Sequence, residues 1–217
     1  MKETDLFLLD YLDELFPNPQ SALHFSNPFE CLCAVMLSAQ TTDASVNKVT
    51  PNLFAKYPDA FAMSKASLEE VESAIHSIGL YHAKAKNLLG LSKALVERHD
   101  GIVPGDKEAL RKLPGVGVKT ANVVGALCFD IPAIAVDTHV ARVSKRLGYA
   151  KDDDDPVTIE KKLEKIFPEE RHIKLHHQII HFGRTICHAM RPECEKCALT
   201  NRCRYFKKSS STKGKKS

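Results

Sequence analysis

The chain has 217 residues, of which 43% are hydrophobic, and a formal net charge of +4. This length allows one generous core or two modest ones, and the small basic excess suits a nucleic-acid partner without requiring one. No apolar run is long enough to span a membrane, and acidic residues stand where a signal peptide would need positive and apolar ones. We therefore expect a cytoplasmic protein whose seven cysteines are thiols or metal ligands rather than disulfides.

The first half of the chain has the spacing of successive helices. Residues 4–16 are amphipathic, and Pro28 begins a nearly all-apolar run to Ser38 that predicts a buried helix. Cys31 and Cys33 lie two positions apart on it and point to different faces, so we interpret them as core residues. Further helices are expected through residue 54 after a polar break at 39–43, and at 67–77, 83–98, 105–112 and 118–129.

Two turns in this half carry residues with more than one interpretation. Gln40 follows the buried helix, where a side-chain amide is either a cap or a reader of base edges. Leu80, Tyr81 and His82 form an apolar and aromatic turn. Such a turn is either a hydrophobic staple between helices or a wedge for a base stack.

The stretch from Leu113 to Ala121 predicts two helices joined by a hairpin. Asp106 is a suitable N-cap for the first helix, and Pro114 and Gly115 end it. Apolar spacing resumes at once from Val118, so the glycines leave backbone N–H groups uncovered at a helix N-terminus. Such a site binds phosphate, with Lys119 at its edge, although a glycine-rich turn can also be purely structural.

A nucleotide-binding P-loop is excluded for this stretch. Gly117 and Lys119 are not adjacent, and a helix rather than a strand leads into the turn.

The second half predicts helices up to Leu147, then at 157–167 and 173–188, with an acidic linker at 150–156. Asp137 precedes the first of these and is a good N-cap. His176, His177 and His181 share one predicted helix, where no carboxylate or cysteine lies at ligand spacing, so packing explains them best. No alternating run is long enough for a sheet. The sequence predicts an all-α fold, with a disordered tail from Lys207 to Ser217.

Four cysteines, Cys187, Cys194, Cys197 and Cys203, occupy 17 residues with the spacing C-x6-C-x2-C-x5-C. Thiols this close in a reducing compartment indicate metal ligands, and the metal would stabilise a segment poor in apolar residues. Their spacing leaves zinc and iron–sulfur both open.

The hairpin with its lysine, then Val136-Asp137-Thr138-His139-Val140, then the four cysteines together resemble the endonuclease III family of helix–hairpin–helix DNA glycosylases. The likeness extends to residues 37–43 and 79–81. It implies a six-helix bundle at residues 22–132, with the helix–hairpin–helix at about 106–128. A second helical domain would combine residues 1–21 and 133–206 and hold a 4Fe-4S cluster in the loop 187–203.

The resemblance also implies site residues. Lys119 matches the family's nucleophile and Asp137 the aspartate that assists it, while the four cysteines match the cluster ligands. Val118 stands where the family pattern has arginine, so one positive charge is absent beside the nucleophile. Residues expected to contact DNA, where Gln40 and Leu80 would fill the space of an extruded nucleotide, are Gln40, Leu80, His82, Gly115, Gly117, Thr120, His139 and Arg191.

The activity implied is that of a bifunctional DNA glycosylase and AP lyase of base excision repair. It would act as a monomer, associated with the nucleoid, on double-stranded DNA with an oxidised or ring-saturated pyrimidine or an abasic site. One alternative is a monofunctional adenine mismatch glycosylase, but that branch has serine at the position of Lys119 and a glutamate near Ala34. The other is a non-catalytic DNA-binding scaffold with a structural metal.

Overall fold

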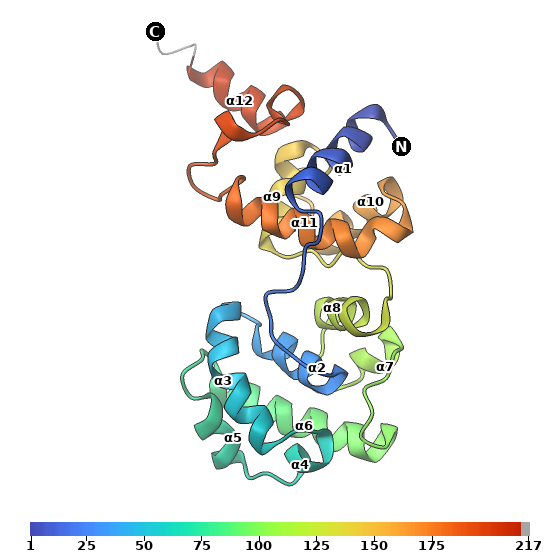
Figure 1. The fold of residues 1–217 in the computed structure, drawn as a ribbon, viewed down its shortest axis with the longest axis vertical. Coiled ribbons are helices and arrows are strands. Elements are labelled where there is room, and N and C mark those ends of the chain that lie inside the picture. The colour runs from blue at the N-terminus through green and yellow to red at the C-terminus, as the bar shows by residue number, and fades with distance from the viewer. Residues whose placement is uncertain (214–217) are drawn as a thin grey trace. The chain divides into compact units, whose positions relative to one another are not determined.

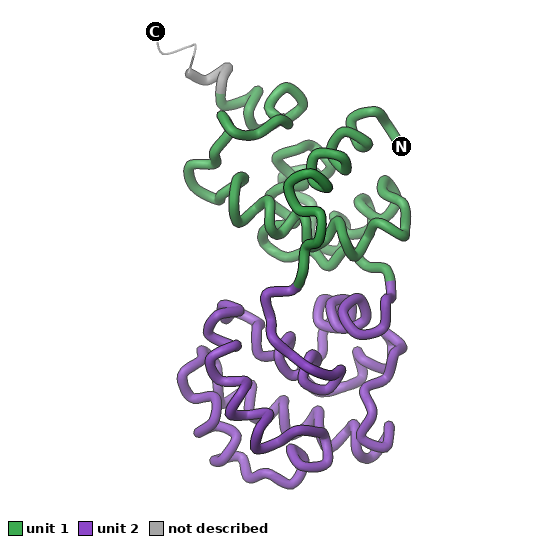
Figure 2. Tube along the Cα trace, in the orientation of Figure 1, with its two compact units in different colours: residues 1–20, 132–217 green, residues 21–131 purple. Residues whose placement is uncertain are grey.

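The computed structural model describes residues 1–213, and within this range every regular element is a helix, so the expected all-α fold is confirmed (Figure 1). No helix in this part of the chain combines the length and apolar character needed to cross a membrane. The chain forms two compact units, residues 21–131 and residues 1–20 with 132–217 (Figure 2). The bundle expected from the sequence was residues 22–132.

The unit of residues 21–131 holds seven α-helices around one apolar core. In it α6 packs against α4 and α5, and α8 packs against α2 and α7 (Figure 1). Cys31 and Cys33 are fully buried, which confirms their role as core residues. The helices are α2 (Pro28–Leu37), α3 (Asp43–Lys56), α4 (Ala60–Ser64), α5 (Leu68–Ile75), α6 (Tyr81–His99), α7 (Lys107–Arg111) and α8 (Val118–Phe129).

Helix α4 is an addition to the six helices expected in this unit. It has five residues, too few for apolar periodicity to reveal it. The side chain of Asp59 accepts a hydrogen bond from the N–H of Ala62 at 2.7 Å, and Ala60 and Met63 are fully buried. An N-cap and packing therefore fold a segment that is too short to be helical alone.

The other unit joins the N-terminal helix to the second half of the chain. Helix α11 packs against both α1 and α9, and α9 also contacts α10 and α12. Helix α11 ends at Thr185, three residues before the expected end at His188. Its elements are α1 (Glu3–Leu15), α9 (Thr138–Leu147), α10 (Pro156–Ile166), α11 (His172–Thr185), α12 (Arg204–Lys213) and the 3-10 turns η1 (Glu169–Arg171), η2 (Cys194–Lys196) and η3 (Thr200–Arg202).

The disordered tail expected from Lys207 was wrong for residues 207–213, which continue helix α12, while residues 214–217 lie outside the described part. The helix is held by contacts that composition does not reveal. The guanidinium carbon of Arg146 lies 4.4 Å from the ring centre of Tyr205, and Lys208 pairs with Asp152 at 3.7 Å. A cation–π contact and an ion pair thus stabilise a segment without apolar periodicity.

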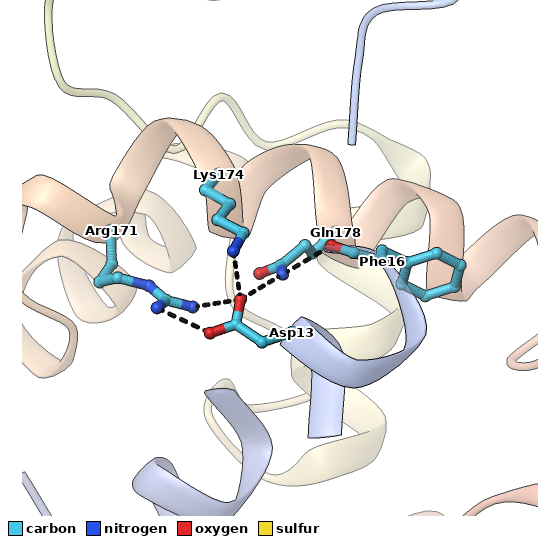
Figure 3. Close-up of polar contacts among 5 residues, drawn as sticks. All are labelled: Asp13, Phe16, Arg171, Lys174 and Gln178. Carbon is cyan, nitrogen blue, oxygen red and sulfur yellow. Dashed lines mark hydrogen bonds and ion pairs between the residues drawn. The ribbon is translucent and has the colours of Figure 1, made fainter. Parts of the chain in front are cut away.

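A polar network fastens α1 to α11 (Figure 3). The guanidinium of Arg171 donates to both carboxylate oxygens of Asp13 at 2.9 Å, and Lys174 lies 2.7 Å away. The buried amide of Gln178 donates to Asp13 at 2.8 Å and to the carbonyl oxygen of Phe16 at 3.1 Å. Burial raises the pKa of Asp13, but the hydrogen bonds from Arg171, Lys174 and Gln178 outweigh it and hold that pKa well below its usual range.

The depressed pKa of Asp13 makes its contribution to stability depend on pH. Above the unfolded-state pKa of about 3.9 the contribution is complete, and it falls as the pH drops toward the folded-state pKa. We expect Asp13→Asn to lower the free energy of unfolding by about 1–2 kcal/mol at pH 7, because charged hydrogen bonds are lost from a partly exposed site. The difference from wild type should shrink steadily below about pH 4.

Denaturant unfolding between pH 2 and 7 checks this expectation. Asp10→Asn, an exposed aspartate on the same helix, is the matched control and should match wild type. An equal cost for Asp13→Asn at every pH would contradict the linkage.

Candidate functional site

The predicted helical hairpin is present, with α7 and α8 as its two helices. The Asp106 side chain caps α7 by accepting from the N–H of Ala109 at 2.8 Å, as expected. Gly115 has φ +76°, and a Cβ built there would lie 2.9 Å from atoms of Asn87 and Met36. Only glycine fits this position without strain, so Gly115 fixes the sharp turn of the hairpin.

Gly117 and Lys119 lie at the open end of the hairpin. Gly117 is the N-cap of α8 and has no side chain to accept from the first N–H groups, and a Cβ there would meet nothing within 4 Å. The first turn of α8 contains no acidic residue. The amides and the positive end of the helix dipole are therefore free to meet an anion.

Lys119 is exposed on this first turn, and Thr120 beside it is half-buried. Among the residues whose side chains are described, none forms an ion pair or hydrogen bond with the Lys119 amine. The Lys119 amine is thus accessible to a reactant, and no carboxylate among these described side chains forms an ion pair with it. Val118, next to it, presents 43% of its surface to solvent.

Gln40 and Leu80 occupy two exposed turns of the same unit, and each has a left-handed backbone, with φ +54° and +60°. Leu80 is 59% exposed and takes no part in a hydrophobic staple, whereas Tyr81 of the same turn packs against the core. Its neighbour His82 is held by Glu72, with 2.8 Å between Nδ1 and Oε1. A leucine kept in solvent by its own backbone geometry is available to a partner.

Asp137 is the N-cap of α9, as the sequence predicted. Its Oδ1 accepts from the N–H of Val140 at 2.8 Å, and the side chain is half-buried. This bond orients the carboxylate and occupies one of its two oxygens.

His139 packs within its own unit against the small residue Gly183 of α11. Its Nδ1 lies 3.1 Å from a guanidinium nitrogen of Arg142, so this ring nitrogen is the acceptor. Burial lowers the pKa of His139, and the charges of Arg142 and Arg184 lower it further against the opposing effect of Asp137. His139 therefore accepts a hydrogen bond from Arg142 and helps to hold it in place.

Arg142 and Arg146 bind the segment that begins the cysteine loop. Arg142 donates to the carbonyl oxygens of Gly183 at 2.8 Å and Cys187 at 3.1 Å. Arg146 donates to the carbonyl oxygens of His188 at 2.6 Å and Ala189 at 2.9 Å, and its Nη1 lies 3.3 Å from the Cys187 sulfur. Sequence reasoning missed both arginines. Their only signal is a spacing of four residues, which places two positive charges on one helix face.

The four cysteines line a single pocket together with Arg146. Burial raises the pKa of Cys194 and Cys197, and the charges of Cys187 and Cys203 raise both further. The four thiols are therefore close enough to interact electrostatically. Within the described residues, no three His, Cys, Asp or Glu side chains converge on a point suited to a single metal ion. His176 and His177 are buried, in keeping with a packing role.

Arg191 is exposed in the same loop and has φ +51°, an unusual backbone for a residue other than glycine.

Residues 33–169 match the family model of the HhH-GPD superfamily base excision DNA repair proteins. The endonuclease III of Bacillus subtilis (strain 168) is 50% identical over 202 residues, which cover 93% of this chain and 92% of that protein. The endonuclease III of Escherichia coli (strain K12) is 44% identical over 207 residues, covering 95% and 98%.

A solved structure of a trapped covalent intermediate between an endonuclease III and DNA, an estranged-adenine complex, has the same fold. It superposes with a TM-score of 0.91 and 48% identity, over 97% of this chain and all of that chain.

The two hairpin glycines give a matched pair of substitutions. We expect Gly115→Ala to lower the free energy of unfolding by about 1–3 kcal/mol, because it places a Cβ at a positive φ and against two side chains. Gly117→Ala, at φ −87° in open space, should cost less than about 0.5 kcal/mol. Chemical denaturation of both variants is the measurement, and equal costs would contradict the assigned turn geometry.

Proposed function

The chain belongs to the endonuclease III family of base excision DNA repair proteins, and from this premise we propose that Lys119 makes it a bifunctional DNA glycosylase and AP lyase. The observation that carries the proposal is the exposed Lys119 amine, without a carboxylate partner among the described side chains, on a first helical turn without acids. The substrates are damaged pyrimidines and abasic sites in double-stranded DNA. A relative of the same fold forms a covalent intermediate with DNA, as this chemistry requires.

The proposed reaction uses one amine twice. A neutral Lys119 Nζ attacks C1′ of the sugar, and the bond from C1′ to the base breaks with its electron pair leaving on the base. The nitrogen, positively charged after the attack, passes one proton to the departing base, and the sugar ring opens as its O4′ takes up a proton, which leaves a protonated Schiff base. Removal of a proton from C2′ then expels the 3′ oxygen by β-elimination, and water hydrolyses the Schiff base to free the lysine. A single residue thus gives both activities.

Asp137 is the proposed partner of this lysine. A carboxylate stabilises the positive charge that develops on the sugar as the base departs, and it can transfer protons between the steps. Its bond to the N–H of Val140 fixes the side chain before substrate arrives. Fixing one oxygen leaves the second for the reaction.

In this proposal one set of groups binds the DNA backbone, and another set fills the gap left by the extruded nucleotide. The open amides near Gly117 hold a backbone phosphate, which positions the duplex without reading its sequence. Gln40 and Leu80 enter the space left by the extruded nucleotide. A saturated or oxidised pyrimidine stacks poorly, so extruding it costs less than extruding a normal base. Secondary contacts are proposed for His82, Thr120, His139 and Arg191.

The proposed cofactor is a 4Fe-4S cluster held by Cys187, Cys194, Cys197 and Cys203. The donor set fits, because four thiols line one pocket and Arg146 donates toward one of the sulfurs, which suits a thiolate ligand. When bound, the cluster crosslinks a loop that has few apolar contacts of its own. Arg142 and Arg146 hold the start of that loop through its carbonyl oxygens.

Trapping with borohydride tests the nucleophile, because the reagent reduces a Schiff base to a stable amine. We expect wild-type protein to crosslink to a duplex with a ring-saturated thymine, and Lys119→Ala to lose crosslinking and strand cleavage by at least about a thousandfold. Lys93→Ala, an exposed lysine of α6, is the control and should crosslink normally. Crosslinking by Lys119→Ala at the wild-type level would rule out this nucleophile.

Iron and sulfide analysis tests the cofactor. The purified protein should contain about four irons and four acid-labile sulfides per chain and show broad visible absorption. Cys197→Ser should lose most of the iron and destabilise the protein, whereas Cys128→Ser, outside the loop, should keep it. A colourless protein containing stoichiometric zinc would contradict the assignment.

A further inference from the structure

Lys84 is a buried lysine in the first turn of α6, with only 5% of its surface exposed. Its amine donates to the hydroxyl oxygen of Thr41 at 2.5 Å, and no carboxylate among the described side chains pairs with it. Burial lowers the pKa of Lys84. A buried ammonium with one neutral partner costs stability, and an apolar side chain of similar length would often stabilise the fold more. Stability alone therefore does not explain this residue.

The partner of Lys84 lies in the turn that carries Gln40. The Thr41 hydroxyl donates to the carbonyl oxygen of Ala39 at 3.5 Å while it accepts from Lys84. The Thr41 N–H donates to the carbonyl oxygen of Ser38 at 3.1 Å. These bonds close the turn around Gln40, whose φ of +54° is costly unless its surroundings hold it.

The backbone of Lys84 is bonded to the second exposed turn. Its N–H donates to the carbonyl oxygen of Leu80 at 3.0 Å, and Leu80 has φ +60°. On the other side, Glu72 of α5 holds His82. A single residue thus bonds to the turn of Gln40 through its side chain and to the turn of Leu80 through its backbone.

We infer that Lys84 is a positioning residue, which acts through Thr41 to hold Gln40 and Leu80 at the spacing needed to fill the gap of an extruded nucleotide. The inference rests on the proposed function. Two side chains that enter one gap must arrive together, and a misplacement of about 1 Å can cost up to about a hundredfold in rate. The hydrogen bond between Lys84 and Thr41 matters most when a base must be extruded. An abasic site has no base to extrude and needs it less.

Paired substrates test this role. We expect Thr41→Val and Lys84→Met to slow single-turnover excision of a ring-saturated thymine about tenfold. Strand cleavage at a pre-formed abasic site should change less than about twofold, because no base is extruded there. Thr41→Ser keeps the hydroxyl and should restore excision, and the double variant should be no slower than the slower single one. The melting temperature of Lys84→Met should equal or exceed that of wild type.

Ser92→Ala is the control for a purely structural effect, because it removes a buried hydroxyl of α6 that donates to the carbonyl oxygen of Leu88 in the same helix. Wild-type excision rates in both Thr41→Val and Lys84→Met would overturn the inference. Equal losses of activity on both substrates, in proportion to the fraction of folded protein as expected for Ser92→Ala, would also overturn it. If wild-type protein cleaved neither duplex, the proposed function itself would fail, and the inference with it.

Discussion

A lysine can act as a nucleophile only where no carboxylate keeps its proton, and this constraint governs the hairpin. Some lysines elsewhere in the described chain are paired with carboxylates, as Lys56 is with Glu70 at 2.8 Å and Lys196 with Glu193 at 2.7 Å. Lys119 differs because α8 begins without an acidic residue and with a glycine as its N-cap. The same absence of acids opens the helix N-terminus to phosphate. The absence of acidic residues at the start of α8 thus favours both the proposed reaction of Lys119 and the proposed binding of a DNA phosphate.

Helix α9 organises the other unit in a comparable way. Its N-cap is Asp137, the proposed partner of the nucleophile, and its later turns carry Arg142 and Arg146, which bind the start of the cysteine loop. His139, in the first turn of α9, accepts a hydrogen bond from Arg142. One helix therefore positions both the carboxylate and the start of the cysteine loop.

Local signals in the sequence were enough to predict most helices and the N-caps Asp106 and Asp137. Val118–Phe129 was predicted with its observed bounds, because a glycine precedes it and apolar residues recur within it. Helices α4 and α12 were missed, since distant packing rather than periodicity stabilises them. Lys84, Arg142 and Arg146 were missed for a related reason. Each is explained by a partner at least 41 residues away in the chain, as with Lys84 and Thr41 or Arg142 and Gly183.

The central claim concerns one amine, so the most direct measurement identifies the residue bonded to DNA. The protein is reduced with borohydride while it acts on a duplex with an abasic site, digested with nuclease and protease, and analysed by mass spectrometry. We predict that the sugar remnant lies on the side chain of Lys119, on the peptide containing the start of α8. A remnant on any other lysine, or on the amino terminus, would contradict the account.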